Sequence, residues 1–191
     1  MDSMDMIESN LKFQSNYSIR QEKPDAIVLH HAAASSASVE TVHGWHLENG
    51  WAGIGYHFYV RKDGSVYRGR PENWIGAHTT GHNEKIGICA EGNFEKETMP
   101  DMQQKALVEL LAYLFDKYGE MKVYGHRDFA ATACPGKNYP MDSIVKAARE
   151  YGDTLYCVQV GAFAVRENAE NLLAKLKKAG YSDAFITAKK R

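Results

Sequence analysis

One short stretch of the chain, residues 123–136, contains a histidine and a cysteine at a spacing that suits a shared site. His126 and Cys134 lie eight residues apart, with a glycine directly before the histidine and Pro-Gly directly after the cysteine. Glycine and proline at these places predict a loop that folds back on itself rather than a continuous helix. Imidazole nitrogen and thiolate sulfur are ligands that Zn²⁺ prefers, so this stretch predicts part of a metal site.

A hydrolytic zinc site needs a third protein ligand and an open position for water, so another ligand must come from elsewhere in the chain. The apolar run at residues 26–29 follows Pro24 and has the pattern of a short buried strand. This run ends in His30 and His31, and neighbouring strand residues point to opposite faces. Only one of these histidines can therefore face the metal, and spacing alone does not decide which.

Five motifs follow one another in order along residues 25–150. They are His30 after the apolar strand, Gly-Tyr-His-Phe at 55–58, Gly-Ala-His at 76–78, Gly-His-Arg-Asp at 125–128 and Cys-Pro-Gly at 134–136. Together they resemble the zinc-dependent N-acetylmuramoyl-L-alanine amidases, a family that includes phage lysozyme-type amidases and the animal peptidoglycan recognition proteins.

The resemblance implies a metal shell. By family position the Zn²⁺ ligands are His30, His126 and Cys134, while His31 faces the other side of its strand, where it packs under a helix or donates to a carbonyl. Zinc in such a shell lowers the pKa of its water toward about 7 and polarises a carbonyl oxygen, as cleavage of an unactivated amide requires.

The resemblance also assigns residues around the metal. Tyr56 is expected to donate to the developing oxyanion, although a tyrosine in an aromatic hairpin can also serve only in strand packing. Thr132 is expected at the catalytic site where some relatives carry lysine, and Cys89 stands where others carry a catalytic glutamate, so the general base stays open. His78 is expected to line the substrate groove, with a surface-loop histidine as the alternative.

The resemblance implies a peptidoglycan hydrolase that cleaves between the lactyl group of N-acetylmuramic acid and L-alanine, and we expect it to act as a phage or prophage endolysin. A pure peptidoglycan-binding module is one alternative, but silent relatives of that kind lack the metal cysteine. A wall hydrolase with Cys134 as nucleophile and His126 as base is the other.

Charge and composition exclude other partners. The 191 residues carry 23 basic and 24 acidic side chains and no basic block, which argues against nucleic-acid binding. No apolar run is long enough to cross a bilayer, so no membrane partner is expected. Residues 1–8 lack the pattern of a secretory signal, and the 3 cysteines suit a reduced compartment, so we expect a cytoplasmic protein until release to the cell wall.

The elements that must position the site alternate between strands and helices after an N-terminal arm at residues 1–24 that has room for one short edge strand. Helices are predicted over residues 39–47, 102–118 and 141–148, and strands over 26–29, 55–60, 65–69, 86–90 and 123–124. This order predicts an α/β fold with a mixed central sheet flanked by helices, and a catalytic domain at residues 25–150.

The composition changes near residue 152, and residues 151–191 form a separate C-terminal module. A strand from Leu155, a helix around Leu172 and a strand at residues 185–187 are predicted there, as a small β-α-β appendage. The run at residues 158–163 resembles the first half of a SPOR domain, which binds bacterial glycan strands. So short a module buries little core alone, which leaves three outcomes: a disordered segment, packing on the catalytic domain, or pairing of two copies. Of these we expect a homodimer, which also adds wall affinity.

Overall fold

The computed structural model of the protein describes residues 4–15, 17–151 and 158–188. The chain divides into two compact units, Met1–Thr154 and Leu155–Arg191, and each is described by itself.

The first unit is built around a mixed sheet, as the alternating pattern predicted. Its strands are β1 (Ile7–Glu8), β2 (Ala26–His31), β3 (Phe58–Val60), β4 (Val66–Arg68), β5 (Ile86–Ala90) and β6 (Lys122–Gly125). They lie in the order β1-β4-β3-β5-β2-β6. The β3–β4 hairpin is antiparallel and the other pairs are parallel, with β1 of the N-terminal arm at one edge.

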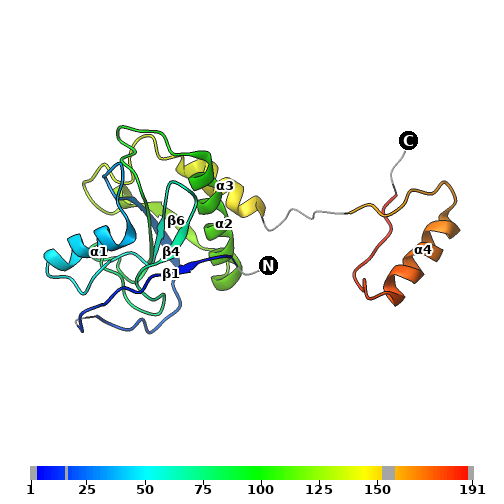
Figure 1. Cartoon of the computed structure of the whole chain (residues 1–191), viewed down its shortest axis with the longest axis horizontal. Coiled ribbons are helices and arrows are strands. Elements are labelled where there is room, and N and C mark those ends of the chain that lie inside the picture. Colours follow the sequence, from blue (N-terminus) through cyan, green and yellow to red (C-terminus); the bar gives the residue numbers. More distant parts are fainter. Residues whose placement is uncertain (1–3, 16, 152–157, 189–191) are drawn as a thin grey trace. The chain divides into compact units, whose positions relative to one another are not determined.

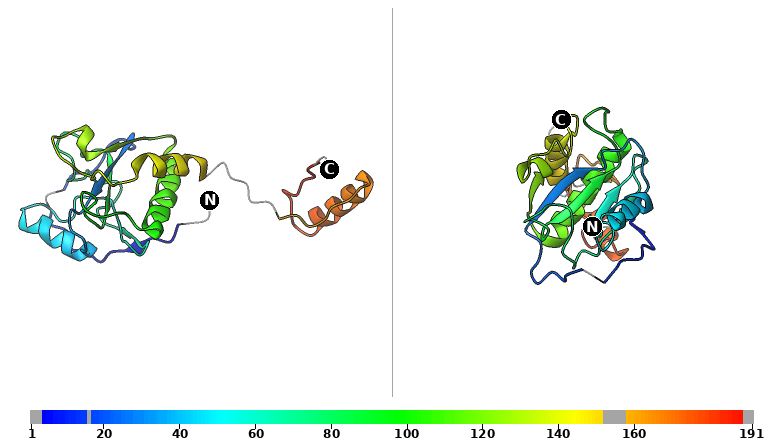
Figure 2. Two further views of the ribbon diagram at one scale, coloured as in Figure 1. Left: turned by 90° about the horizontal axis from the view of Figure 1, so that it is seen from above. Right: turned by 90° about the vertical axis from the view of Figure 1, so that its left-hand side faces the viewer.

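Helices cover both faces of this sheet (Figure 1). They are α1 (Val39–Glu48), α2 (Asp101–Tyr118) and α3 (Met141–Tyr151). Ser38 caps the start of α1, because the Thr41 backbone N–H donates to the Ser38 hydroxyl at 3.2 Å. Figure 2 shows α2 and α3 together on one face and α1 on the opposite face. The predicted α/β fold with a flanked mixed sheet is confirmed.

Alternation along the strands separates two apolar clusters. Phe58 and Val60 of β3 join the larger cluster, whereas Tyr59 between them joins the smaller one with Val39 and Val42 of α1. The larger cluster includes the buried face of α2, namely Leu107, Leu110, Leu111 and Leu114. Because side chains alternate in this way, His30 and His31 at the end of β2 must also point to opposite faces.

The described part of the second unit contains one helix, α4 (Arg166–Lys178). None of its side chains is buried. The strand predicted at residues 185–187 is absent, and the described residues 158–160 of the strand predicted from Leu155 are not in a strand either; residues 155–157 lie outside the described part. Strands need hydrogen-bonded partners, and the described residues of this unit offer none.

Among the described residues, no helix has both the length and the apolar character needed to span a membrane.

Candidate metal centre and active site

Two neighbouring parallel strands bring the histidines of the candidate metal centre together. In the register of β2 and β6, Leu29 lies opposite Gly125, so His30 and His126 follow at the same edge of the sheet. His126 begins the short 3-10 helix η1 (His126–Asp128), whose start is held by the Gly125 N–H donating to the Asp128 carboxylate at 2.8 Å. The imidazole centroids of His30 and His126 lie 4.7 Å apart.

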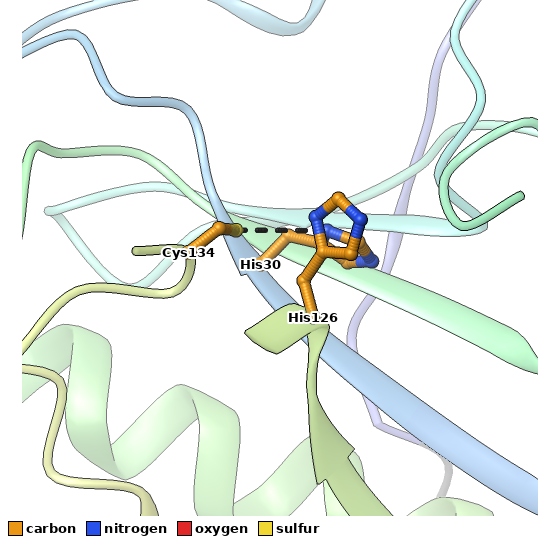
Figure 3. Close-up of side chains that lie close together, drawn as sticks. All are labelled: His30, His126 and Cys134. Carbon is orange, nitrogen blue, oxygen red and sulfur yellow. Dashed lines mark hydrogen bonds between the residues drawn. The ribbon is translucent and has the colours of Figure 1, made fainter. Parts of the chain in front are cut away.

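The loop after η1 returns Cys134 to the same point, as the Gly and Pro-Gly pattern predicted. The Arg127 N–H donates to the Cys134 carbonyl at 2.9 Å and closes this loop. Cys134 Sγ then lies 3.7 Å from His30 Nδ1, and Figure 3 shows the three side chains pointing toward one another. The ligand atoms of His30, His126 and Cys134 all lie within 4.8 Å of one another, which is close enough for one ion to contact all three.

The donor set and its environment fit zinc. Burial lowers the pKa of both imidazoles, that of His30 well below its usual value with a further contribution from His78, so both rings are neutral near pH 7 and keep a lone pair. Burial raises the pKa of the Cys134 thiol to about 11. A cation at this point would stabilise the thiolate, so two imidazoles and one thiol suit the preferences of Zn²⁺.

His31 lies on the opposite face of the sheet and outside this group. Its ring is buried next to Phe94, and Nδ1 accepts the Phe94 backbone N–H at 3.1 Å. We expected His31 to pack under a helix or to donate to a carbonyl. Its Nδ1 instead accepts a hydrogen bond. The separation of the two histidines onto opposite faces follows the prediction.

Tyr56 lies beside the three candidate ligands. Its ring centroid is 5.0 Å from that of His30. Burial of the hydroxyl raises the Tyr56 pKa well above its usual value, with further contributions from the Cys89 and Cys134 thiols. The phenol is therefore protonated at neutral pH and can donate a hydrogen bond.

The two other residues at positions that vary among relatives have different surroundings. Thr132 is exposed, and its hydroxyl accepts the Cys134 N–H at 3.2 Å, so it supports the backbone of a candidate ligand. Cys89 on β5 lies opposite His30 on β2 and is fully buried. Burial raises the pKa of the Cys89 thiol well above its usual value, so it stays protonated and cannot act as a carboxylate base would.

His78 reaches this region but lies beneath the candidate ligands rather than on an open groove. Its side chain is buried, and its Nδ1 lies 3.1 Å from His30 Nε2. Its other nitrogen, Nε2, donates to the Lys85 carbonyl at 3.1 Å. Both ring nitrogens therefore already have partners inside the protein, and the groove-lining role stays a prediction.

His46 was not among the residues predicted for the site, but the structure places it next to Tyr56. The ring centroids of His46 and Tyr56 lie 5.3 Å apart, and those of His46 and Trp51, which is 40% exposed, lie 4.6 Å apart. His46 Nδ1 accepts the Gly55 N–H at 2.8 Å, and burial lowers its pKa to about 4. Its position four residues after Val42, on the buried face of α1, was the available signal.

Comparison with known families divides the chain in two. The family model for N-acetylmuramoyl-L-alanine amidase matches residues 20–137. The model for the SPOR domain matches residues 142–191.

Individual proteins are also similar to the amidase part of the chain. The endolysin of Escherichia phage T7 is 34% identical over 125 residues, which cover 61% of this chain and 83% of the phage protein. Peptidoglycan-recognition protein SC2 of Drosophila melanogaster is 37% identical over 125 residues, covering 58% and 67% of the respective chains. The solved N-acetylmuramoyl-L-alanine amidase LysC from Clostridium intestinale superimposes with a TM-score of 0.74 at 38% identity, over 77% of this chain and 99% of that one. With its motifs, fold and converging side chains, the chain belongs to the N-acetylmuramoyl-L-alanine amidase family and is a peptidoglycan amidase.

Proposed function

We propose that the amidase is zinc-dependent and that His30, His126 and Cys134 hold the metal. The observation that carries this proposal is the convergence of two neutral imidazoles and one thiol from separate segments, with ligand atoms within 4.8 Å of one another. Zinc bound there would supply a Lewis acid that lowers the pKa of water and polarises the scissile carbonyl.

The chain's own contribution to the reaction is orientation and hydrogen-bond donation. The substrate carbonyl belongs to the lactyl group of N-acetylmuramic acid, and the leaving group is the amino group of L-alanine. As water adds to this carbonyl, negative charge develops on its oxygen, and Tyr56 donates its hydroxyl proton in a hydrogen bond to that oxygen. The raised pKa of Tyr56 supports this role because the donor keeps its proton at neutral pH.

The remaining residues act around this centre. Thr132 supports the backbone of Cys134 through its hydroxyl, and the free hydroxyl proton can be offered to the substrate. The exposed ring of Trp51, next to His46, offers an apolar face to a sugar or peptide.

A cysteine hydrolase is the alternative that one observation addresses directly. A nucleophilic cysteine needs a lowered pKa, next to a cationic or basic partner. Burial instead raises the Cys134 pKa to about 11, and the imidazoles beside it are neutral. This environment favours a metal ligand over a free nucleophile.

The biological setting we propose is that of a phage or prophage endolysin, as the similarity to the phage T7 endolysin suggests. In this setting the protein stays in the cytoplasm until it is released to the wall. The catalytic domain is residues 25–150, and residues 151–191 add wall affinity and join two copies into a homodimer. The exposed apolar side chains of the tail, among them Val158 at 87% and Phe185 at 64%, support a partner for this segment.

The reaction is tested by digesting purified peptidoglycan and analysing the products by mass spectrometry. We expect free L-alanine amino termini and intact glycan chains. A chelator should abolish the activity, and added Zn²⁺ should restore it. Activity that survives chelation but is lost on thiol alkylation would contradict zinc dependence and indicate the cysteine hydrolase.

A further inference from the structure

We propose that His78, together with Thr79, holds the His30 imidazole in the tautomer and orientation that bind a metal through Nδ1. His78 would then be a positioning residue for the amidase reaction, acting through His30 rather than as a metal ligand itself. This inference rests on the proposed zinc site and explains how the ring of one ligand, His30, is oriented and which of its nitrogens is left free for the metal.

The hydrogen-bond chain begins at a backbone carbonyl. His78 Nε2 lies 3.1 Å from the Lys85 carbonyl oxygen, which can only accept, so this nitrogen carries the ring proton. In a neutral imidazole the other nitrogen is then an acceptor. That acceptor, His78 Nδ1, lies 3.1 Å from His30 Nε2 and 3.0 Å from the Thr79 hydroxyl.

The same chain determines the tautomer of His30. If His30 Nε2 carries its proton, it can donate to His78 Nδ1 or to Thr79 Oγ1, which lies 3.3 Å away. The other tautomer would leave two unprotonated nitrogens 3.1 Å apart, with only one Thr79 hydroxyl proton to satisfy both. The protonated Nε2 is therefore favoured, and the bare nitrogen is Nδ1, which faces Cys134 Sγ at 3.7 Å.

The His78 ring is held in place by a closely fitted slot. A Cβ atom added at Gly76 or at Gly87 would lie 2.5 Å from His78 Cδ2, so a side chain at either position would collide with the ring. The backbone is held as well, because the Asn83 side-chain oxygen accepts the N–H groups of His78 and Thr79 at 2.7 and 2.8 Å. A ring fixed by packing and by backbone contacts can transmit its orientation to His30.

Outer hydrogen-bond partners of metal-binding histidines set the ring orientation and raise the basicity of the ligand, and their loss typically costs about 10- to 100-fold in metal affinity or activity. Here the partner is a neutral histidine anchored to a carbonyl. We therefore expect His78→Phe, which keeps a planar ring but removes the acceptor, to weaken zinc binding by about this factor.

The experiment measures the zinc affinity of the full chain by competition with a chromophoric chelator. His43→Phe is the matched control, because His43 is also buried and bonded at both ring nitrogens, to the Ile54 N–H and the Lys12 carbonyl, each at 3.1 Å. We expect the control to keep the wild-type affinity within about threefold, against the 10- to 100-fold loss expected for His78→Phe. Equal affinities for all three proteins would overturn the positioning role while leaving the zinc site intact. A wild-type chain that binds no zinc would overturn the proposed function and this inference with it.

A second measurement uses the unmodified chain, so it does not depend on the folding of a variant. Nitrogen-15 NMR of the metal-free protein distinguishes the two neutral tautomers of His30. We expect a protonated Nε2 and a bare Nδ1. A proton on Nδ1 would contradict the tautomer assignment, whatever the zinc affinity of the variants.

Discussion

Helices α2 and α4 both carry leucines at three- and four-residue steps, but the two regions of the chain use them differently. In α2, Leu107, Leu110, Leu111 and Leu114 are fully buried against the sheet and α3. In α4, no side chain is buried. The apolar spacing predicts the helix in both cases, but full burial requires a second packed layer, and in the described part of the tail Leu172, Leu173 and Leu176 are only partly buried.

The same contrast holds for the groups that can do chemistry. All 8 histidines lie before residue 151, and the described tail, residues 158–188, has neither histidine nor cysteine. The candidate ligands are held by strand register, a closed loop and buried hydrogen bonds, all of which depend on the packed sheet. The candidate ligands therefore place the proposed metal chemistry in the first region, and what we propose for the tail is binding and association.

Among variants that keep the metal, the largest effect on turnover is expected from the loss of a single hydroxyl in the first region. Tyr56→Phe should keep the fold and the metal but lower kcat by about 10²- to 10³-fold, because one donor to the oxyanion is lost. Tyr59→Phe is the matched control, since its hydroxyl donates to the Ala37 carbonyl at 2.8 Å and should affect stability rather than turnover. If Tyr56→Phe lowered kcat by less than about threefold, Tyr56 would serve only in packing and not as a donor to the oxyanion.

Two leucine substitutions test the difference in packing directly. Leu110→Ala should lower the free energy of unfolding by about 2 to 5 kcal/mol, because it leaves a cavity in a fully buried site. Leu172→Ala in α4 should change the same transition by less than about 0.5 kcal/mol. Chemical denaturation followed by tryptophan fluorescence measures both. Similar losses would show that α4 packs on the first region.

Buried histidines make the first region sensitive to acid. The pKa values of His46 and His78 are about 4 in the folded protein, lowered by burial, whereas an unfolded histidine titrates near about 6.5. The unfolded chain therefore binds more protons between these values, and the free energy of unfolding should fall as the pH falls from about 6.5 to about 4.

Denaturation of the metal-free protein across this range measures the effect, and His46→Phe should show a shallower dependence. A free energy of unfolding that did not change with pH would contradict the neutral, buried state of these rings.

Removal of the tail should have the smallest effect on chemistry. A chain that ends at Tyr151 should hydrolyse a soluble peptidoglycan fragment at the wild-type rate, but it should be monomeric and pellet less with cell walls. Light scattering that gave monomer masses for both the intact and the shortened chain would rule out the proposed dimer. Unchanged pelleting would rule out a binding role for the tail.

The sequence was most informative for features that depend on residues close together in the chain. The turn residues around His126 and Cys134 predicted a returning loop, and alternation along β2 separated His30 from His31, as the structure shows. The hairpin, the sheet class and the amphipathic α2 were also predictable, because each depends on a short-range period.

Contacts between distant segments were not predictable in this way. The slot around His78 is formed by Gly76 and Gly87, and its acceptor role depends on the Lys85 carbonyl and on His30, 48 residues away in the chain. The strand predicted at residues 185–187 was wrong for a related reason, and the described residues 158–160 of the other predicted tail strand are not in a strand either. A segment with β-propensity becomes a strand only when a partner strand is present.

Zinc content measured together with activity tests the central claim most directly. Metal analysis of the purified chain should give one zinc per molecule, and Cys134→Ser should lose the zinc and the amidase activity together. Cys157→Ser, at a cysteine outside the group of candidate ligands, should keep both. A Cys134→Ser protein that retained its zinc and full activity would contradict the assignment of His30, His126 and Cys134 as the metal site.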